Sequence, residues 1–220
     1  MAKVLVTGAN RGIGLEFCRQ LAERGDDVIA VCREASPELL ELAVQVLDKI
    51  DVSDDGNIDR LRRHLHHTRL DLLINNAGIL VRDSLEHYHH YGLLRQFEVN
   101  AVAPLRVATE LLGSLGRGSK IVTITSSMSS IEENTSGGYY GYRMSKVAVN
   151  MAMKSLSVDL KDRGIGVFLL HPGYVATDMT EYSGPVSPAV SVRDMLERIN
   201  ELQLSDTGSF HHAQGREIPW

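Results

Sequence analysis

The sequence is poor in cysteine and has no concentration of basic residues. Its 220 residues include only Cys18 and Cys32, too few for a disulfide framework or a cysteine metal site, so we expect a reducing compartment. Lys and Arg together number 23 against 28 Asp and Glu, which gives a formal net charge of -5. Because nucleic acids and anionic membranes bind concentrated positive charge, neither is expected as the main partner.

Long apolar runs are also missing. No stretch is apolar over enough residues to span a bilayer, and Met1 leads directly into a short apolar segment rather than into a signal peptide. We therefore expect a cytoplasmic protein. A hydrophobic fraction of 43% over 220 residues suits one domain that covers residues 1–220.

What the sequence does contain is a regular alternation of short apolar runs with longer segments of helical period. Near-continuous apolar runs are typical of strands covered on both faces, and the alternation predicts βαβ units with right-handed crossovers. The predicted fold class is α/β: a single doubly wound parallel sheet with helices on both faces (a Rossmann fold), whose ligands bind beyond the carboxyl ends of the strands. The predicted strands are Val4–Val6, Val28–Cys32, Leu70–Ile74, Ile121–Ile124 and Val167–Leu170, and the predicted helices are Gly14–Arg24, Ile58–His66, Leu93–Leu112 and Gly141–Leu160.

A glycine-rich turn, Thr7-Gly-Ala-Asn-Arg-Gly-Ile-Gly14, joins the first predicted strand to the first helix. Such a turn lets the backbone approach a pyrophosphate, whose negative charge is favoured at a helix N-terminus. A tight structural turn is the alternative, but the position at the start of the alternation favours dinucleotide binding. The predicted contact residues are Gly8, Asn10, Arg11, Gly12, Ile13 and Gly14.

The second predicted strand ends in Val31-Cys32-Arg33 and lacks the acidic residue that commonly binds the adenosine ribose. Arg33 and Arg11 could instead hold a 2'-phosphate with several hydrogen bonds. Two exposed surface arginines are the alternative. The pattern favours NADP(H) over NAD(H).

Two further segments carry polar groups near strand ends. Asp51, followed by Val52, could bond the adenine amino group or merely cap the next segment. Asn76, Ala77 and Gly78 close another strand, where small residues leave room for a cofactor and the amide can bind backbone or ribose. These residues could also form a turn that fixes the end of the strand, and this structural role is compatible with cofactor binding.

Tyr142 and Lys146 are four residues apart in a predicted helix and share one helix face. A free tyrosine has a pKa of about 10, and a nearby lysine cation favours the phenolate and lowers that pKa. Such a pair could move a proton to or from a substrate oxygen. Taken alone, however, it is more simply a half-buried tyrosine and a solvated lysine.

The order and spacing of these motifs resemble the short-chain dehydrogenase/reductase family. The glycine turn, Asn75-Asn-Ala-Gly78, Asn100, serines after a strand, the YxxxK pair and Pro172-Gly173 coincide over nearly the whole chain. Residues 126–146, 154–180 and 215–220 look most like the branch that contains the Sniffer carbonyl reductase and the C-factor proteins.

The resemblance implies a role for each matching residue. Tyr142 would be the general acid in carbonyl reduction, and Lys146 would lower its pKa and hold the nicotinamide ribose. Asn100 would bind a water that links the lysine to solvent, unless it is only a buried polar group bonded to backbone. The nicotinamide carboxamide would be held by the backbone of Val175 and the hydroxyl of Thr177, and Pro172 and Gly173 would also contact the cofactor. Residues 178–189 would form a mobile loop over the substrate.

The resemblance also implies a serine whose hydroxyl bonds the substrate oxygen. The usual family spacing of thirteen residues before the tyrosine points to Ser129. Aligning the strand Lys120–Ile124 instead places Ser126 at the strand exit and leaves residues 132–138 as a loop with three inserted residues. We choose Ser126, because a strand fixes geometry better than a loop count does. The available serines are Ser126, Ser127, Ser129 and Ser130.

Nine histidines are present, and histidine is a common metal ligand. No acidic or cysteine partner completes a set, and the family needs no catalytic metal, so no metal site is expected. The histidines gather at His64, His66 and His67 and at His87, His89 and His90.

These patterns together predict an NADPH-dependent reductase that converts a ketone or aldehyde to an alcohol by hydride transfer, with Tyr142 as the acid. A cofactor-binding signalling or sensor protein of the C-factor type is the alternative. A sugar-nucleotide epimerase is disfavoured, because the chain after Thr177 is too short for a substrate domain. The family often pairs helices equivalent to Leu93–Leu112 and Gly141–Leu160, which implies a homodimer or homotetramer, although one-chain relatives exist.

Overall fold

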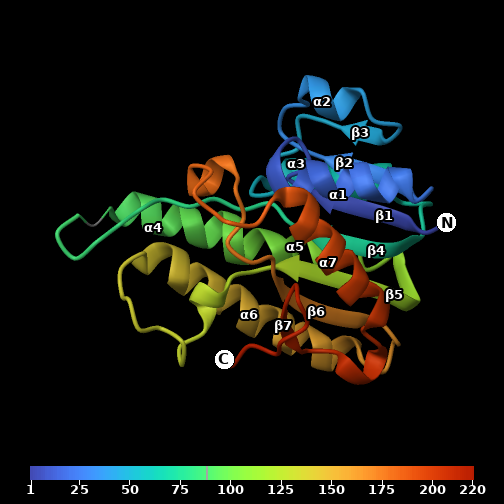
Figure 1. Cartoon of the computed structure of the whole chain (residues 1–220). Coiled ribbons are helices and arrows are strands. Elements are labelled where there is room, and N and C mark those ends of the chain that lie inside the picture. Colours follow the sequence, from blue (N-terminus) through green and yellow to red (C-terminus); the bar gives the residue numbers. More distant parts are fainter. Residues whose placement is uncertain (88) are drawn as a thin grey trace.

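A seven-stranded parallel sheet forms the centre of the molecule (Figure 1). The computed structural model describes residues 1–87 and 89–220. The strand order is β3-β2-β1-β4-β5-β6-β7, and every neighbouring pair is parallel. The predicted doubly wound parallel sheet is thereby confirmed. The strands are β1 (Lys3–Thr7), β2 (Asp27–Val31), β3 (Gln45–Leu47), β4 (Leu70–Asn75), β5 (Leu115–Ile124), β6 (Gly166–His171) and β7 (Phe210–His212).

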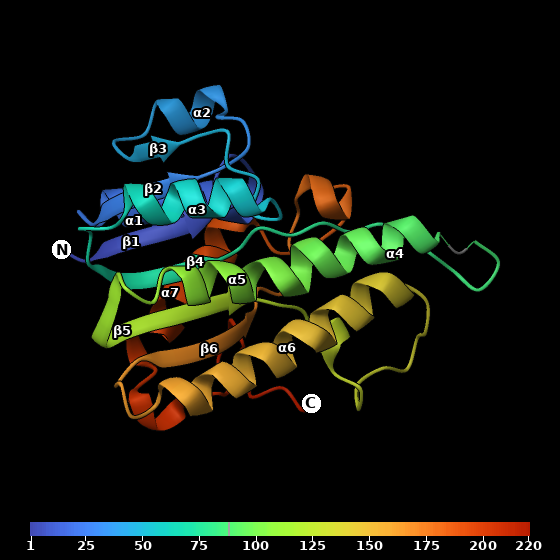
Figure 2. The ribbon, with the colours of Figure 1, turned by 180° about the vertical axis from the view of Figure 1, so that it is seen from behind.

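Helices cover both faces of this sheet. Figure 1 shows α1 and α7 on one face, and Figure 2 shows α3, α5 and α6 on the other. Shorter elements are the π-helical turn Glu98–Val102 and three turns of 3-10 helix, at Ser127–Ser129, Asp178–Thr180 and Leu204–Asp206. The α-helices are α1 (Gly12–Glu23), α2 (Pro37–Leu40), α3 (Asp55–His64), α4 (His90–Phe97), α5 (Ala103–Glu110), α6 (Tyr140–Leu160) and α7 (Pro188–Glu201).

Two hydrophobic cores result from the alternation of side chains along each strand. In β1, Leu5 packs in the core beneath α3, α5 and α6, whereas Val4 and Val6 pack in the core beneath α1 and α7. Successive side chains of a strand point to opposite faces, so a strand buried on both sides must be apolar throughout. The near-continuous apolar runs of the sequence have this cause.

Several elements differ from the sequence prediction. The edge strands β3 and β7, with three residues each, were not predicted, because β3 is partly exposed and β7 contains two histidines. Helix α7 was also missed, although Ser187 accepts a hydrogen bond from Val190 N and Pro188 begins the helix, which are ordinary start signals. Within the described part of the chain, no helix has both the length and the apolarity needed to cross a membrane.

The predicted helix Leu93–Leu112 is interrupted. Helix α4 ends at Phe97, the π-helical turn Glu98–Val102 follows, and α5 begins at Ala103 and ends at Glu110. Single π turns inside α-helices occur frequently at functional sites. This one contains Asn100, which is buried.

Candidate active site

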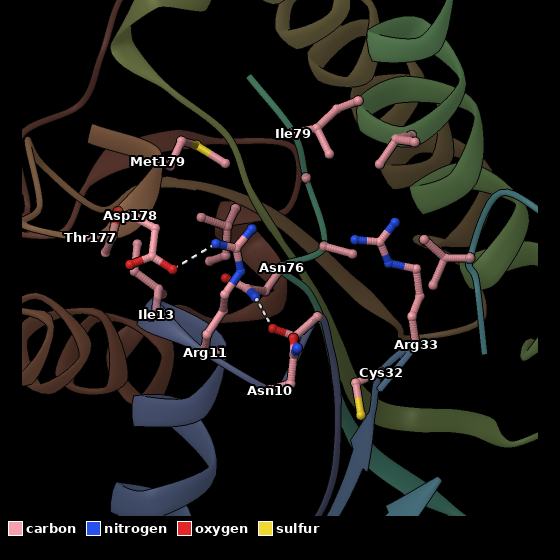
Figure 3. Close-up of a pocket in the computed structure, with 18 of the residues that line it drawn as sticks. Asn10, Arg11, Ile13, Cys32, Arg33, Asn76, Ile79, Thr177, Asp178 and Met179 are labelled. Carbon is pink, nitrogen blue, oxygen red and sulfur yellow. Dashed lines mark hydrogen bonds and ion pairs between the residues drawn. The ribbon is translucent and has the colours of Figure 1, made fainter. Parts of the chain in front are cut away.

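A cavity of about 300 Å³ lies where β1 and β4 meet, at the point where the strand order reverses (Figure 3). Ligands of doubly wound sheets bind at this switch point. The cavity brings together most of the residues that the sequence singled out. Those that line it are Gly8, Asn10, Arg11, Gly12, Ile13, Gly14, Arg33, Asp51, Val52, Asn76, Ala77, Gly78, Tyr142, Lys146, Pro172 and Thr177.

The glycine turn is built so that only glycine fits at its critical positions. Gly8 has φ +67°, and a Cβ there would lie 2.8 Å from Ala77 Cα. A Cβ on Gly14 would lie 2.1 Å from Gly8 O. At Gly12, with φ +54°, a Cβ would approach only Thr177, at 3.4 Å. The backbone at Gly12, where α1 begins, is therefore open to the cavity and suits the approach of a pyrophosphate.

Thr7 and Asn76 hold the glycine turn against the end of β4. Asn76 Nδ2 donates to Thr7 O at 3.0 Å and to Gly8 O at 3.2 Å. The Thr7 hydroxyl accepts from the backbone N–H groups of Asn76 and Ala77, both at 3.1 Å. Of the two roles open to the Asn76 amide, the structure shows binding to backbone.

Two arginines reach the cavity from different elements. Arg33 follows β2 and lies across the cavity from Asp178, whereas Arg11 precedes α1 and forms an ion pair with Asp178 at 2.6 Å (Figure 3). Arg11 thus has a protein partner that the sequence did not indicate. Both arginines line the cavity, and the binding of a 2'-phosphate by them stays a prediction.

Asp51 is bonded to its own segment. Its Oδ1 accepts from Ser53 N at 2.9 Å and from Ser53 Oγ at 2.6 Å, and its Oδ2 lies 3.3 Å from Arg95 Nη2. Partial burial opposes ionisation, but the Ser53 bonds and the charges of Arg95 and Arg33 prevail and lower the pKa of Asp51. Asp51 thus closes a local turn with Ser53, whereas the cap of the following helix α3 is Asp54; the bond of Asp51 to an adenine amino group stays a prediction.

Tyr142 and Lys146 lie on the buried face of α6. Lys146 Nζ is 5.7 Å from the centre of the Tyr142 ring and donates to Ile124 O at 3.0 Å. Burial raises the pKa of Tyr142 to about 12, against a smaller lowering by a hydrogen bond from Ser126, and burial lowers the pKa of Lys146 to about 8. Charge proximity alone predicted a lowered tyrosine pKa; burial dominates in this structure.

The two serine candidates have different partners. The Ser126 hydroxyl lies near enough to Tyr142 to lower the pKa of the phenol slightly, and it accepts from Met128 N at 3.1 Å. Neither Ser126 nor Ser129 is among the residues that line the cavity. The Ser129 hydroxyl donates to Ser126 O at 2.5 Å and accepts from Asn150 Nδ2 at 2.7 Å. Ser126 is therefore the serine near the phenol, while both hydrogen bonds of the Ser129 hydroxyl stabilise the turn.

Asn100 is fixed by hydrogen bonds to two neighbouring segments. Its Oδ1 accepts from Ile79 N at 2.8 Å, and its Nδ2 donates to Ile79 O at 2.9 Å and to Ser145 Oγ at 3.0 Å. A Cβ on Gly78 would lie 3.3 Å from Asn100 Oδ1 and 3.7 Å from Lys146 Nζ. Asn100 thus lies beside the lysine, behind the cavity wall and outside the lining.

The segment after β6 borders the other side of the cavity. Pro172 and Thr177 line it, whereas Gly173 and Val175 lie behind. Residues 178–189, the predicted substrate loop, contain the 3-10 turn Asp178–Thr180, a bridge from Val186 to Val175, and the first residues of α7.

Sequence reasoning missed part of the lining. Arg95, contributed by α4, is an example. It belongs to no motif, and its place depends on how elements distant in sequence pack together. The others are Ile50, Ile79, Val99, Ile124 and Thr125. Asp178 and Met179, which begin the predicted substrate loop, and Cys32, next to Arg33, also line the cavity. Among residues 1–87 and 89–220, no group of three or more His, Cys, Asp or Glu side chains is placed to hold a metal ion.

Comparison with known proteins agrees with this geometry. A family model described as short chain dehydrogenase matches residues 2–186. The chain belongs to the short-chain dehydrogenase family. Within it, the chain is 34% identical to the 1-hydroxy-2-glutathionyl-2-methyl-3-butene dehydrogenase of Rhodococcus sp. (strain AD45) over the full length of both. It is 42% identical to the C-signal of Myxococcus xanthus, over 69% of this chain and 93% of that protein.

Solved structures of this short-chain dehydrogenase family match the whole chain. The carbonyl reductase Sniffer of D. melanogaster superposes with a TM-score of 0.94 and 31% identity, and the match covers both chains fully. The NADPH-bound carbonyl reductase from chicken fatty liver has a TM-score of 0.90 and 29% identity, covering 100% of this chain and 99% of that one. The predicted likeness to the Sniffer and C-factor branch is confirmed.

Proposed function

We propose that the protein is an NADPH-dependent carbonyl reductase that reduces a ketone or aldehyde to an alcohol. The observation that carries the proposal is that Tyr142 and Lys146 line the cavity together, with the Ser126 side chain near the Tyr142 phenol. A substrate oxygen bound in the cavity beside Tyr142 would then meet a phenol, with a hydroxyl and an ammonium next to it. Family membership and the likeness to carbonyl reductases support the same reaction.

The residues of the cavity fit NADP(H). The Gly12 backbone leaves space for the pyrophosphate at the start of α1, and Arg33 supplies a planar donor for a 2'-phosphate at the end of β2. The position after β2 holds no carboxylate that would repel such a phosphate. The chicken enzyme, which superposes on the whole chain, holds NADPH.

In the reaction, Tyr142 gives its proton to the oxygen of the carbonyl group. Because its pKa is raised to about 12, the phenol is protonated at neutral pH and ready to donate. Ser126 donates to the same oxygen and stabilises the charge that develops on it. NADPH, when bound, supplies the hydride for the carbonyl carbon. The reverse oxidation of an alcohol uses the same groups.

Lys146 holds its position through the bond to Ile124 O, which leaves its other two N–H donors for a ribose hydroxyl. Its charge also stabilises the phenolate that Tyr142 becomes after it loses the proton. Asn100 and Gly78 fix the wall beside Lys146, so the ammonium keeps its place relative to the phenol.

A panel of ketones and aldehydes, assayed by NADPH absorbance, tests the proposal. Wild-type protein should oxidise NADPH with at least one class of substrate, and Tyr142→Phe should abolish turnover while the Kd for NADPH stays near its normal value. Undiminished turnover by Tyr142→Phe would reject the tyrosine as the acid.

A second candidate function is signalling, in which the bound cofactor matters and catalysis is secondary. The 42% identity with the C-signal favours it. Complementation of a signal-deficient strain would separate the two: a signalling protein should still complement as Tyr142→Phe, whereas a reductase should not.

We further propose that the protein forms a homodimer through α4, α5 and α6; in Figure 2, α4 and α5 follow one another end to end and α6 lies beside them. Large apolar side chains are exposed on these elements. Multi-angle light scattering should show that the wild-type protein is a dimer and that Met151→Glu is a monomer. A monomeric wild-type protein would reject the proposed dimer. The exposed side chains are Tyr91 and Leu94 of α4, Val102 of the π-helical turn that joins α4 to α5, and Tyr140, Met144, Met151 and Val158 of α6.

A further inference from the structure

Arg143, the residue after Tyr142, holds the loop that carries the serines. Its Nε donates to Gly138 O at 3.1 Å and its Nη1 to Met128 O at 3.2 Å. Its Nη2 donates to Ser136 Oγ at 2.8 Å and to Gly137 O at 3.3 Å. All four hydrogen bonds of this half-buried side chain end on the segment between residues 128 and 138. A planar guanidinium has five donors in a fixed arrangement and is suited to bind several acceptors at once.

One of these bonds leads directly to the proposed catalytic pair. Arg143 holds the carbonyl of Met128, and the N–H of Met128 donates to Ser126 Oγ at 3.1 Å. Because the Ser126 oxygen accepts from Met128 N, the proton of the hydroxyl remains available for the substrate oxygen. A chain of hydrogen bonds therefore connects Arg143 through Met128 to the Ser126 hydroxyl, which lies near Tyr142.

A second fastening of the same loop comes from Asn150. Its Oδ1 accepts from Thr125 Oγ1 at 2.8 Å, and its Nδ2 donates to Ser129 Oγ at 2.7 Å. These bonds fix the backbone on both sides of Ser126. They do not involve Met128, which sets the direction of the Ser126 hydroxyl. The two fastenings thus have separable effects.

We propose that Arg143 is a positioning residue that keeps the Ser126 hydroxyl directed at the substrate oxygen, beside Tyr142, by holding Met128 and the loop beyond it. The inference rests on the proposed function, because it assigns Arg143 an effect on the rate through Ser126. Loss of the guanidinium leaves the residues 128–138 attached to α6 by fewer bonds. The Ser126 hydroxyl then loses its fixed direction, and the tyrosine loses its neighbour in the transition state.

A double-mutant cycle tests this inference. Arg143→Met keeps the aliphatic stem and removes the donors, and Arg143→Lys keeps a charge with a smaller set of donors. Arg163→Met is the matched control, since the exposed Arg163 also donates to a backbone carbonyl, Leu112 O at 3.1 Å, but far from the cavity. We expect Arg143→Met to lower kcat about 10- to 100-fold, Arg143→Lys to restore part of the rate, and the control to be neutral. The Kd for NADPH should stay within about twofold throughout.

The effect of Arg143→Met should nearly vanish when Ser126 is already alanine, because the residue acts through that hydroxyl. An equal loss of kcat in the wild-type and Ser126→Ala backgrounds would overturn the inference, as would an Arg143→Met enzyme with normal kcat.

Hydrogen exchange separates this inference from the proposed function. The amides of Ser129 and Ser130 are protected by bonds to Ser126 O and Ser127 O, at 2.9 and 3.0 Å. They should exchange faster in Arg143→Met, and unchanged exchange would overturn the inference whatever the activity. Faster exchange in a protein whose wild type reduces no carbonyl compound would reject the proposed function but keep the hold of Arg143 on the loop.

Discussion

The guanidinium of Arg11 and the carboxylate of Asp178 form a 2.6 Å ion pair that joins the glycine turn to the segment after β6. Arg11 is also one of the two cavity-lining arginines that the sequence predicts to bind a 2'-phosphate. The same side chain cannot serve both partners fully, so Asp178 competes with the cofactor for it. Asp178→Asn should therefore bind NADPH about two- to fivefold more tightly than wild type, as measured by isothermal titration calorimetry.

The competition has its own control. In an Arg11→Gln background, Asp178→Asn should have no effect on the Kd for NADPH, because the shared partner is gone. A gain of equal size in both backgrounds would show instead that Asp178 acts by general repulsion of the phosphates.

Arg33 should decide between the two cofactors. Arg33→Asp places a carboxylate after β2, which repels a 2'-phosphate and can accept hydrogen bonds from the ribose hydroxyls of NADH. The ratio of kcat/KM for NADPH to that for NADH should fall by at least about tenfold. An unchanged ratio would remove Arg33 from the phosphate site.

The two serines should separate in kinetics and in stability. Ser126→Ala should lower kcat about 10²- to 10³-fold, because it removes a donor to the reacting oxygen. Ser129→Ala loses bonds to Ser126 O and Asn150 and should lower the free energy of unfolding by about 1 kcal/mol, with a smaller loss of rate. Steady-state assays and urea unfolding measure both; the opposite order of rate losses would identify Ser129 as the catalytic serine.

Lys146 should change how the stability of the cofactor-free protein depends on pH. Its pKa is about 8 when folded against 10.5 for the free side chain, so between these values the unfolded chain binds more protons. Stability from this group therefore rises with pH. The free energy of unfolding of wild type, relative to Lys146→Met, should rise by about 2 kcal/mol between pH 7 and 10. A flat difference in urea unfolding would show that the folded lysine titrates normally.

Gly141 should resist substitution, because it lies where α6 passes close to α4. A Cβ there would lie 2.4 Å from Gln96 Nε2 and 3.2 Å from Leu93 Cα. Gly141→Ala should cost about 1–3 kcal/mol of unfolding free energy and lower kcat, since Tyr142 is the next residue. Gly113→Ala, where a Cβ would meet nothing within 4 Å, is the control and should be nearly neutral in thermal unfolding.

Much of this structure could be predicted because its signals are local. Val4 and Val6 in a run buried on both faces identify a central strand, and the glycines around Gly12 identify the turn by steric need. The spacing of Tyr142 and Lys146 places both on one helix face whatever else the helix contacts. Such features depend on the residues themselves and their nearest neighbours in the sequence.

The remainder depends on contacts between distant segments. No pattern near Asp178 indicates that it meets Arg11, and nothing near Arg95 indicates its approach to Asp51. The pKa of Tyr142 was also predicted in the wrong direction from its neighbour in sequence, because desolvation depends on how completely other elements cover it. Burial is a property of the packed molecule, and no short motif encodes it.

The π-helical turn at Asn100 has a consequence for the phase of the helix it interrupts. Each residue of an α-helix advances by about 100° around the axis, and a π turn accommodates one additional residue in the winding. If the regular winding of α4 continued through these residues, its apolar stripe would meet α5 one residue earlier than the apolar stripe of α5 does. Deleting a single residue within Glu98–Val102 would restore regular winding and carry Asn100 away from Ile79. The extra residue therefore allows Asn100 to face Ile79 at the site while the apolar side chains of α5 face the core.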